Sequence, residues 1–172
     1  MIDLLDKNLI SYLQTDARMS HVRLAKLLWA NERTIRNRMK NLFTRGIINT
    51  IVVPNLASLG YNFIGIMGLQ VRLVELRQVA EELVKHPCVC YLANVTGRYE
   101  FIAIIVTKTS KEYSEFVETV ISAIPSVLKT ETFVSLNVYK GHETGLDTRQ
   151  LVNALEVGTA EKKDRKRRGH NS

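Results

Sequence analysis

The stretch "NERTIRNRMKNLFTRG", residues 31–46, combines a helical spacing of apolar residues with five basic side chains. Wound at about 100° per residue with Ile35 toward a core, it places Leu42 on the same inward stripe. Asn31 is a suitable N-cap, and Gly46 suits the end of a helix because it tolerates positive φ. The spacing therefore predicts a helix with one face packed inward.

The opposite face of this helix is basic and contains no acidic residue. The residues on it or beside it are Arg33, Thr34, Arg36, Asn37, Lys40 and Asn41. A merely solvated helix usually mixes charges and gains ion pairs between residues four apart, and we expect this face to lack them. Arginine and lysine can reach phosphates or guanine, and asparagine can pair with adenine, so the face predicts contact with the major groove of DNA. Arg38 lies nearer the core, where its head group can tie helices together.

Two shorter helices are predicted before this stretch. Leu5, Leu9 and Leu13 follow helical spacing, and Ser20 can cap a second apolar-patterned helix. Three short helices, the last two joined by a tight turn, form the layout of a helix-turn-helix. In that layout the third helix reads bases, while Arg23 on the second helix can contact the DNA backbone.

After residue 46 the pattern changes. Residues 47–54, "IINTIVVP", indicate a β segment, either a small wing or the lead into the next unit. Later apolar patterns predict strands in 62–71, 88–95, 99–107 and 130–140 and amphipathic helices in 74–86 and 110–124, the latter capped by Ser110. The order β-α-β-β-α-β is that of a ferredoxin-like unit with both helices on one face of an antiparallel sheet. The other face then needs cover, which favours a homodimer or a larger assembly.

These patterns predict an α+β protein with four segments. We expect a winged helix-turn-helix domain in 1–50, a β linker in 51–61, a ferredoxin-like domain in 62–141 and a C-terminal extension in 142–172. In the extension, residues 146–155 can add a short helix, and the basic end "EKKDRKRRGHNS" is expected to be disordered. That end either adds salt-sensitive DNA affinity or only solubilises the chain.

The net charge of +7 is unevenly distributed. Residues 1–60 carry +5, residues 61–146 carry −1 and residues 147–172 carry +3. This asymmetry indicates a polyanion-binding end attached to a module with another task. No apolar run reaches the ~20 residues of a membrane span, and no secretory leader is recognisable, so we expect a cytoplasmic protein without membrane contact.

Neither metal chemistry nor catalysis is expected. His86, Cys88 and Cys90 form H-x-C-x-C, but no other His or Cys is near enough in the sequence to complete the about four ligands of a closed metal site. Two cysteines at this spacing share a face of a strand, and free cysteine is commonly a small core residue. The four histidines are scattered and form no evident acid–base pair. We therefore predict no cofactor, no metal and no catalytic residues.

The motifs, taken in order, resemble those of the Lrp/AsnC (feast/famine) family of prokaryotic transcriptional regulators. They are Leu5-Asp6-x-x-Leu9-Ile10-x-x-Leu13, Thr34-Ile35-x-x-Arg38-Met39-x-x-Leu42, Gly46-Ile47-Ile48 and "VTGRYEFIAIIV", residues 95–106. The resemblance implies a winged helix-turn-helix joined to a βαββαβ domain, and dimers that assemble into octamers. It also implies a small-molecule effector, typically an amino acid, bound between subunits near Gly97, Arg98, Tyr99 and Glu100.

Two positions depart from the family pattern. Glu100 stands where the family usually has an aspartate, and Trp29 stands where members commonly have a glycine before a serine cap. Trp29 either fills a hydrophobic gap or presents an exposed aromatic side chain near DNA. The backbone at Gly97 can offer N–H groups to a carboxylate while Glu100 accepts from an ammonium, or Gly97 is simply a hairpin residue at positive φ.

The function that these features favour is a sequence-specific regulator that binds double-stranded DNA and senses a metabolite. One alternative is a haem-biosynthesis decarboxylase, because such enzymes share the architecture, although the basic helix face is hard to explain in an enzyme. Another is an architectural protein that wraps DNA with low specificity. Only a ratio of specific to nonspecific affinity separates this role from regulation.

Overall fold

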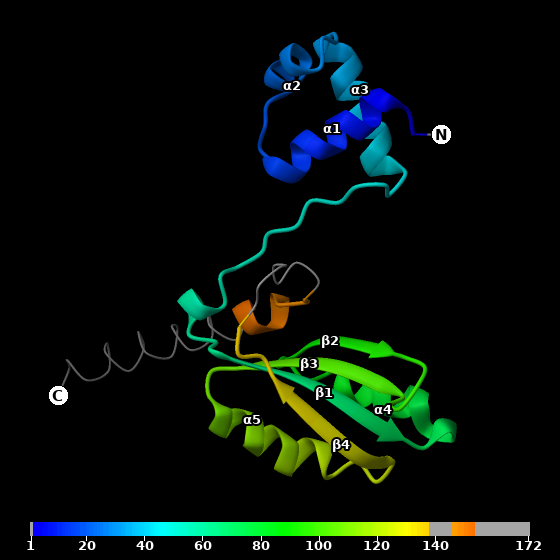
Figure 1. Ribbon diagram of the computed structural model, residues 1–172, viewed down its shortest axis with the longest axis vertical. Helices are drawn as coiled ribbons and strands as arrows, with labels where there is room; N and C mark the ends of the chain where they lie inside the picture. Colours follow the sequence, from blue (N-terminus) through cyan, green and yellow to red (C-terminus); the bar gives the residue numbers. More distant parts are fainter. Residues whose placement is uncertain (1, 138–145, 154–172) are drawn as a thin grey trace, which may run out of the picture. The chain divides into compact units, whose positions relative to one another are not determined.

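The computed structural model describes residues 2–137 and 146–153. The chain divides into two compact units with the boundary after Val52. The first is helical, whereas the second is built on a sheet (Figure 1).

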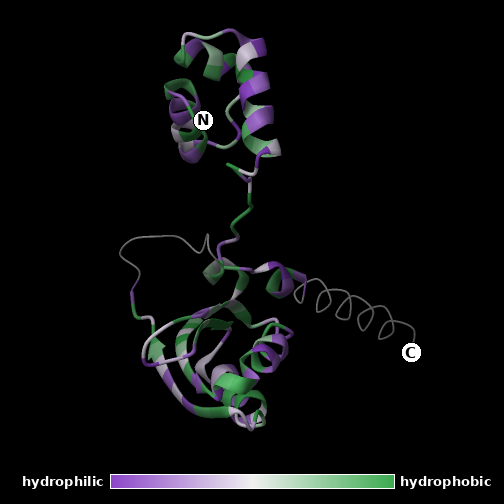
Figure 2. Ribbon diagram, turned by 90° about the vertical axis from the view of Figure 1, so that its right-hand side faces the viewer, coloured by the Kyte–Doolittle hydropathy of each residue, from purple (hydrophilic) through white to green (hydrophobic). Residues whose placement is uncertain are grey.

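The first unit consists of three short helices, α1 (Leu4–Thr15), α2 (His21–Leu27) and α3 (Glu32–Thr44). Apolar side chains from all three meet in one core, whose fully buried members are Leu9, Leu24, Ile35 and Leu42. This arrangement confirms the predicted three-helix layout. It also fixes which side of α3 faces away from the core, and Figure 2 shows hydrophilic residues along much of this helix.

Side-chain caps set where the helices begin. The Ser20 hydroxyl accepts from the N–H of Arg23 at 3.2 Å, and the side-chain amide oxygen of Asn31 accepts from the N–H of Arg33 at 2.8 Å. Both caps were predicted from the sequence and are confirmed. The third helix ends at Thr44, slightly earlier than predicted, and Gly46 follows with a φ of +63°.

The predicted β segment at residues 47–54, and with it the wing and the β linker at 51–61, is wrong. The structure assigns no strand to these residues and places only a 3₁₀ turn, η1 (Ala57–Leu59), within the linker. The side chains of Ile51 and Val52 are 59% and 92% exposed. A β-branched run forms a strand only where a neighbouring strand satisfies its backbone groups, and this run has no such partner among the described residues.

The second unit contains a four-stranded antiparallel sheet in the order β2-β3-β1-β4. Its strands are β1 (Phe63–Val71), β2 (Val89–Asn94), β3 (Phe101–Thr107) and β4 (Val127–Val134). The two central strands pair from Phe63 opposite Thr107 to Leu69 opposite Phe101. This topology confirms the predicted ferredoxin-like unit. The last strand begins and ends earlier than its predicted range of 130–140, of which residues 138–140 lie outside the described residues.

Helices cover one face of this sheet. The short turn η2 (Leu73–Glu75) leads into α4 (Leu76–Leu83), and α5 (Ser110–Phe116) continues into the π-helical segment η3 (Val117–Ile121). Thr109 caps α5, so the prediction of Ser110 was off by one residue. Val79 and Phe116 from the two helices pack with Met67 of β1 in the main core. The π-helical turn had no recognisable signal in the sequence.

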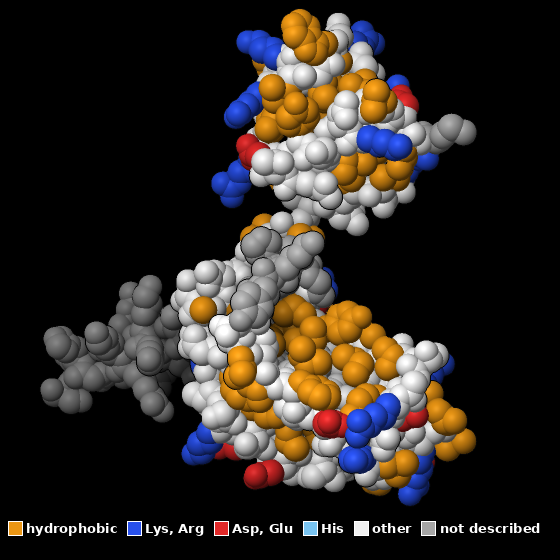
Figure 3. All heavy atoms as spheres, in the orientation of Figure 1, with side chains coloured by type: hydrophobic (Ala, Val, Ile, Leu, Met, Phe, Trp, Pro, Cys, Tyr) orange, Lys and Arg blue, Asp and Glu red, His pale blue; other side chains and the backbone are white. Residues whose placement is uncertain are grey.

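The second face of the sheet is partly covered by the chain's own C-terminal segment. Of the helix predicted for residues 146–155, residues 149–153 are helical, residues 146–148 are not, and residues 154–155 lie outside the described residues. Leu151 packs with Leu56, Tyr61 and Val106. The Tyr61 hydroxyl donates to the carbonyl of Leu151 at 3.1 Å. On other parts of the sheet Phe133 stays 48% exposed. Figure 3 shows hydrophobic side chains gathering where Figure 1 draws the strands.

Within the described residues, no helix is long and apolar enough to cross a membrane.

Candidate functional site

The outward face of α3 is the first candidate site. All seven side chains predicted to contact DNA are exposed, and they are Arg23, Arg33, Thr34, Arg36, Asn37, Lys40 and Asn41. In the part of the chain that the structure describes, no carboxylate lies within 4.0 Å of the charged groups of Arg23, Arg33 or Lys40. These three cations are therefore available to an external anion.

The expectation that this face lacks ion pairs is wrong at one position. The guanidinium of Arg36 lies 2.7 Å from the carboxylate of Glu32, one turn earlier. Such exposed pairs between residues four apart contribute little to stability, so the pair can be exchanged for a contact with a ligand. Arg36 nevertheless starts from a partly neutralised state, unlike Arg33.

Arg38 ties two helices together, as predicted, and its partners Asp3 and Asp6 show that it holds α3 against α1. Its Nη1 lies 2.6 Å from the Asp3 carboxylate and 3.2 Å from the Asp6 carboxylate, whose side chain is only 6% exposed. Asp3 also caps α1, and the N–H of Asp6 lowers the pKa of the Asp3 carboxyl, with a further contribution from Arg38. The position of α3 is thus fixed from behind by a charged contact as well as by the apolar core.

The turn between β2 and β3 is the second candidate site. Gly97 has a φ of +122°, a conformation that glycine adopts without strain. The Glu100 carboxylate accepts from the N–H of Val71 at 2.8 Å, and the Glu100 N–H donates to the carbonyl of Leu69 at 3.0 Å. One Glu100 oxygen is therefore engaged by the chain itself.

Tyr99 and Arg98 converge on a residue that sequence reasoning missed. The Tyr99 hydroxyl donates to the Glu131 carboxylate, which raises the pKa of the Tyr99 phenol, and Arg98 lies 3.1 Å from the same carboxylate. The ring of Tyr99 covers Gly68, where an added Cβ would approach a ring carbon to 2.7 Å. Glu131 lies opposite Gly68 in the sheet. Only this non-local register brings it to the turn.

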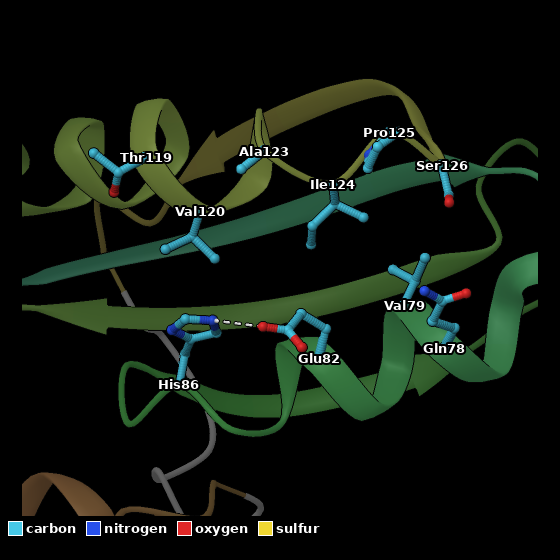
Figure 4. A pocket seen from close by; sticks show the side chains of 10 residues that line it. All are labelled: Gln78, Val79, Glu82, His86, Thr119, Val120, Ala123, Ile124, Pro125 and Ser126. Carbon is cyan, nitrogen blue, oxygen red and sulfur yellow. Dashed lines mark ion pairs between the residues drawn. The ribbon is translucent and has the colours of Figure 1, made fainter.

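A hollow of about 410 Å³ lies elsewhere in the second unit, between α4 and the η3 segment. Figure 4 shows Val79, Val120 and Ile124 pointing into it, with His86 and Glu82 at one end. The imidazole Nε2 of His86 is buried, has no hydrogen-bond partner among the described residues and lies 4.0 Å from Glu82. The residues of the turn at Gly97 do not line this hollow.

The two cysteines have the features of core residues. Cys88 packs against the helix-covered core and Cys90 belongs to the cluster on the other face of the sheet. The prediction that they share a face is therefore wrong, because the register of β2 shifts between Val89 and Tyr91. Burial raises the pKa of Cys88 to about 11 and that of Cys90 to about 12, which disfavours the thiolate. Among the described residues no group of three or more potential ligands could hold a metal ion.

Both units match established family models. The model of the AsnC-type helix-turn-helix domain matches residues 2–42, and that of the Lrp/AsnC ligand binding domain matches residues 63–144. An uncharacterized HTH-type transcriptional regulator of Pyrococcus abyssi is 36% identical over 141 residues, which cover 81% of this chain and 95% of the relative.

Solved structures show the same fold. AsnC of E. coli has a TM-score of 0.78 at 22% identity, with 83% of this chain and 97% of that chain covered. The transcriptional regulator NMB0573 of Neisseria meningitidis, solved as an L-Met complex, has a TM-score of 0.78 at 19% identity, with coverage of 83% and 94%.

Proposed function

The chain belongs to the Lrp/AsnC family of transcriptional regulators, and from that premise we propose that it binds specific DNA sequences through α3 and adjusts this binding to a small metabolite. The observation that carries the proposal is the exposed, basic outward face of α3, braced from behind by Arg38 and the helical core. A helix presented in this way fits the major groove.

The side chains on this face divide into two roles. Arg33 and Asn37 read base edges, because their groups match guanine and adenine, and Thr34 and Asn41 flank them. Lys40 and Arg23 bind phosphates, which positions the protein without selecting a sequence. Arg36 contributes less than Arg33 because it must first leave Glu32.

The first experiment selects binding sites from a randomised duplex pool at two salt concentrations and sequences the retained DNA. We expect an enriched pseudo-palindrome and binding that weakens steeply with salt. Arg33→Ala should relax the preference at one base position and cost about 1–3 kcal/mol, whereas Lys40→Ala should reduce the salt slope by about one.

Arg77→Ala is a matched control, because the Arg77 side chain is 92% exposed on a helix of the second unit. An Arg33→Ala variant with an unchanged sequence preference would contradict the assigned reading face. Salt-sensitive retention without any enriched motif would instead favour architectural wrapping of DNA.

For the effector we propose an amino acid or related compound at the turn of Gly97, Arg98, Tyr99 and Glu100, completed by a second subunit. The turn supports this through its glycine backbone and the Glu100 carboxylate, and the L-Met complex of the Neisseria regulator is consistent with it. Calorimetry with the standard amino acids tests the proposal on Glu100→Gln and, for comparison, on His86→Ala. Loss of binding in His86→Ala alone would move the effector to the hollow beside α4.

We further propose a homodimer formed through the uncovered part of the sheet, with further assembly to an octamer, acting in the cytoplasm and without catalysis. The half-exposed Phe133 and Tyr91 support the dimer, since apolar sheet faces are usually covered. Light scattering of the purified chain and of Phe133→Asp measures the assembly. A Soret absorption band together with no DNA affinity would favour the decarboxylase alternative.

A further inference from the structure

Trp29 occupies the turn between α2 and α3 in an unusual conformation. Its φ is +50°, and it is the only non-glycine residue with positive φ in the described part of the chain. The side chain is 97% exposed, the highest fraction among the large apolar residues that remain exposed. A bulky residue in the left-handed region is strained, and an exposed indole gains nothing from burial.

The fold of the first unit does not require this side chain. Trp29 is absent from the helical core, so the idea that it fills a hydrophobic gap is wrong. The turn is closed by the backbone, through the N–H of Ala30 donating to the carbonyl of Ala25 at 3.0 Å. Glycine or asparagine would adopt the same backbone with less strain, so the indole must be explained by something outside the unit.

The surroundings of Trp29 select the kind of partner. Residues 21–46 contain seven Lys or Arg and a single acidic residue, Glu32, which is paired with Arg36. Lys26 precedes the tryptophan by one turn, and the cap of α3 follows two residues later. A polyanion suits this neighbourhood, and an indole can pack its face on a sugar or base while its N–H donates to a phosphate.

We propose that Trp29 is a DNA contact at the edge of the α3 reading face, with its indole packed against the sugar–phosphate backbone. The inference rests on the proposed DNA-binding function. It adds to that function a contact that lies outside the helix surface and that the helical periodicity cannot indicate.

The chain offers a direct test because Trp29 is its sole tryptophan. The full-length protein is titrated with a fluorescently labelled duplex taken from the site selection. Anisotropy of the label measures binding, while tryptophan emission and its quenching by acrylamide report on Trp29. We expect the emission to change over the same concentration range as the anisotropy, and the quencher to lose access in the complex.

Two variants test the energetic contribution. Trp29→Gly and Trp29→Asn both suit the positive φ, so they should melt no lower than the wild-type chain and bind the duplex about tenfold more weakly. Val52→Asn, which removes another almost fully exposed apolar side chain, is the matched control and should bind like the wild type.

The outcomes separate the two proposals. If anisotropy shows binding but tryptophan emission, quenching and the affinity of Trp29→Gly are all unchanged, the indole does not contact DNA and this inference is overturned alone. If the wild-type anisotropy never changes with any selected duplex, the proposed DNA-binding function fails and the inference fails with it.

Discussion

The outward face of α3 and the turn at Gly97 differ in whether their polar side chains already have partners within the chain. On α3, Arg33 and Lys40 project from one helix and engage no carboxylate among the described residues. At the turn, Glu100 bonds to β1 and Tyr99 bonds to Glu131 on β4. The helix presents a ready surface, whereas the turn is already bound to its own sheet.

This difference shows why the helix surface is easier to predict from the sequence than the turn. A helix surface is set by the spacing of residues within one segment, so its exposed side follows once the buried side is known. The turn depends on residues that are distant from it in the sequence, since Gly68 of β1 precedes it and Glu131 of β4 follows it. We expect substitutions behind α3 to affect folding, and substitutions at the turn to affect mainly local geometry.

The largest effect is expected for Leu24→Ala in the core behind α3. Leu24 is fully buried, so its truncation should lower the free energy of unfolding of the first unit by about 2–5 kcal/mol. Urea titration followed by circular dichroism measures the loss. Leu27→Ala, on the same helix with a 40% exposed side chain, is the control, and an equal loss in both variants would contradict the assigned core.

An intermediate effect is expected for Arg38→Met, which keeps the apolar stem of the side chain but removes the charge. The buried Asp6 carboxylate then loses its cation, at a cost of about 1–3 kcal/mol in the free energy of unfolding. Urea titration measures this loss in the free energy of unfolding. Arg45→Met, at an exposed position at the end of α3, is the control. If both variants unfold alike, Arg38 does not hold α3 in place.

The smallest effect is expected for Gly68→Ala in β1, where the Tyr99 ring of the turn covers the glycine. The added Cβ displaces the Tyr99 ring and separates its hydroxyl from Glu131, at a cost of about 1 kcal/mol because the partly exposed ring can move aside. Thermal melting measures the cost, and the ultraviolet titration of the phenol shows the pKa of Tyr99 falling toward its usual value. An unchanged phenol titration would mean that Tyr99 keeps its bond to Glu131.

Much of the fold followed from local patterns. The caps at Ser20 and Asn31, a role for Arg38 in tying helices together and the order of strands and helices were all predicted from spacing and residue type. Residues 47–54 were misjudged because their β-branched side chains favour a strand only beside a partner, which they lack in the described structure.

The candidate sites were less predictable because they depend on contacts between distant segments. The pairing of Arg36 with Glu32 follows a known helical spacing and could have been anticipated. The register shift that separates Cys88 from Cys90, and the pairing that brings Glu131 to Tyr99, exist only once the strands have assembled. The hollow beside His86 likewise depends on the π-helical segment η3.

The segment that carries Leu151 lies outside both matched family models, which end at residues 42 and 144, yet it completes a hydrophobic cluster of the second unit. A chain trimmed to the family boundary would uncover Leu56 and Tyr61 and remove the acceptor of the Tyr61 hydroxyl. Anyone preparing the second unit alone should therefore retain residues up to 153. A shorter version would expose an additional apolar surface, and any self-association of it would then say little about that of the full chain.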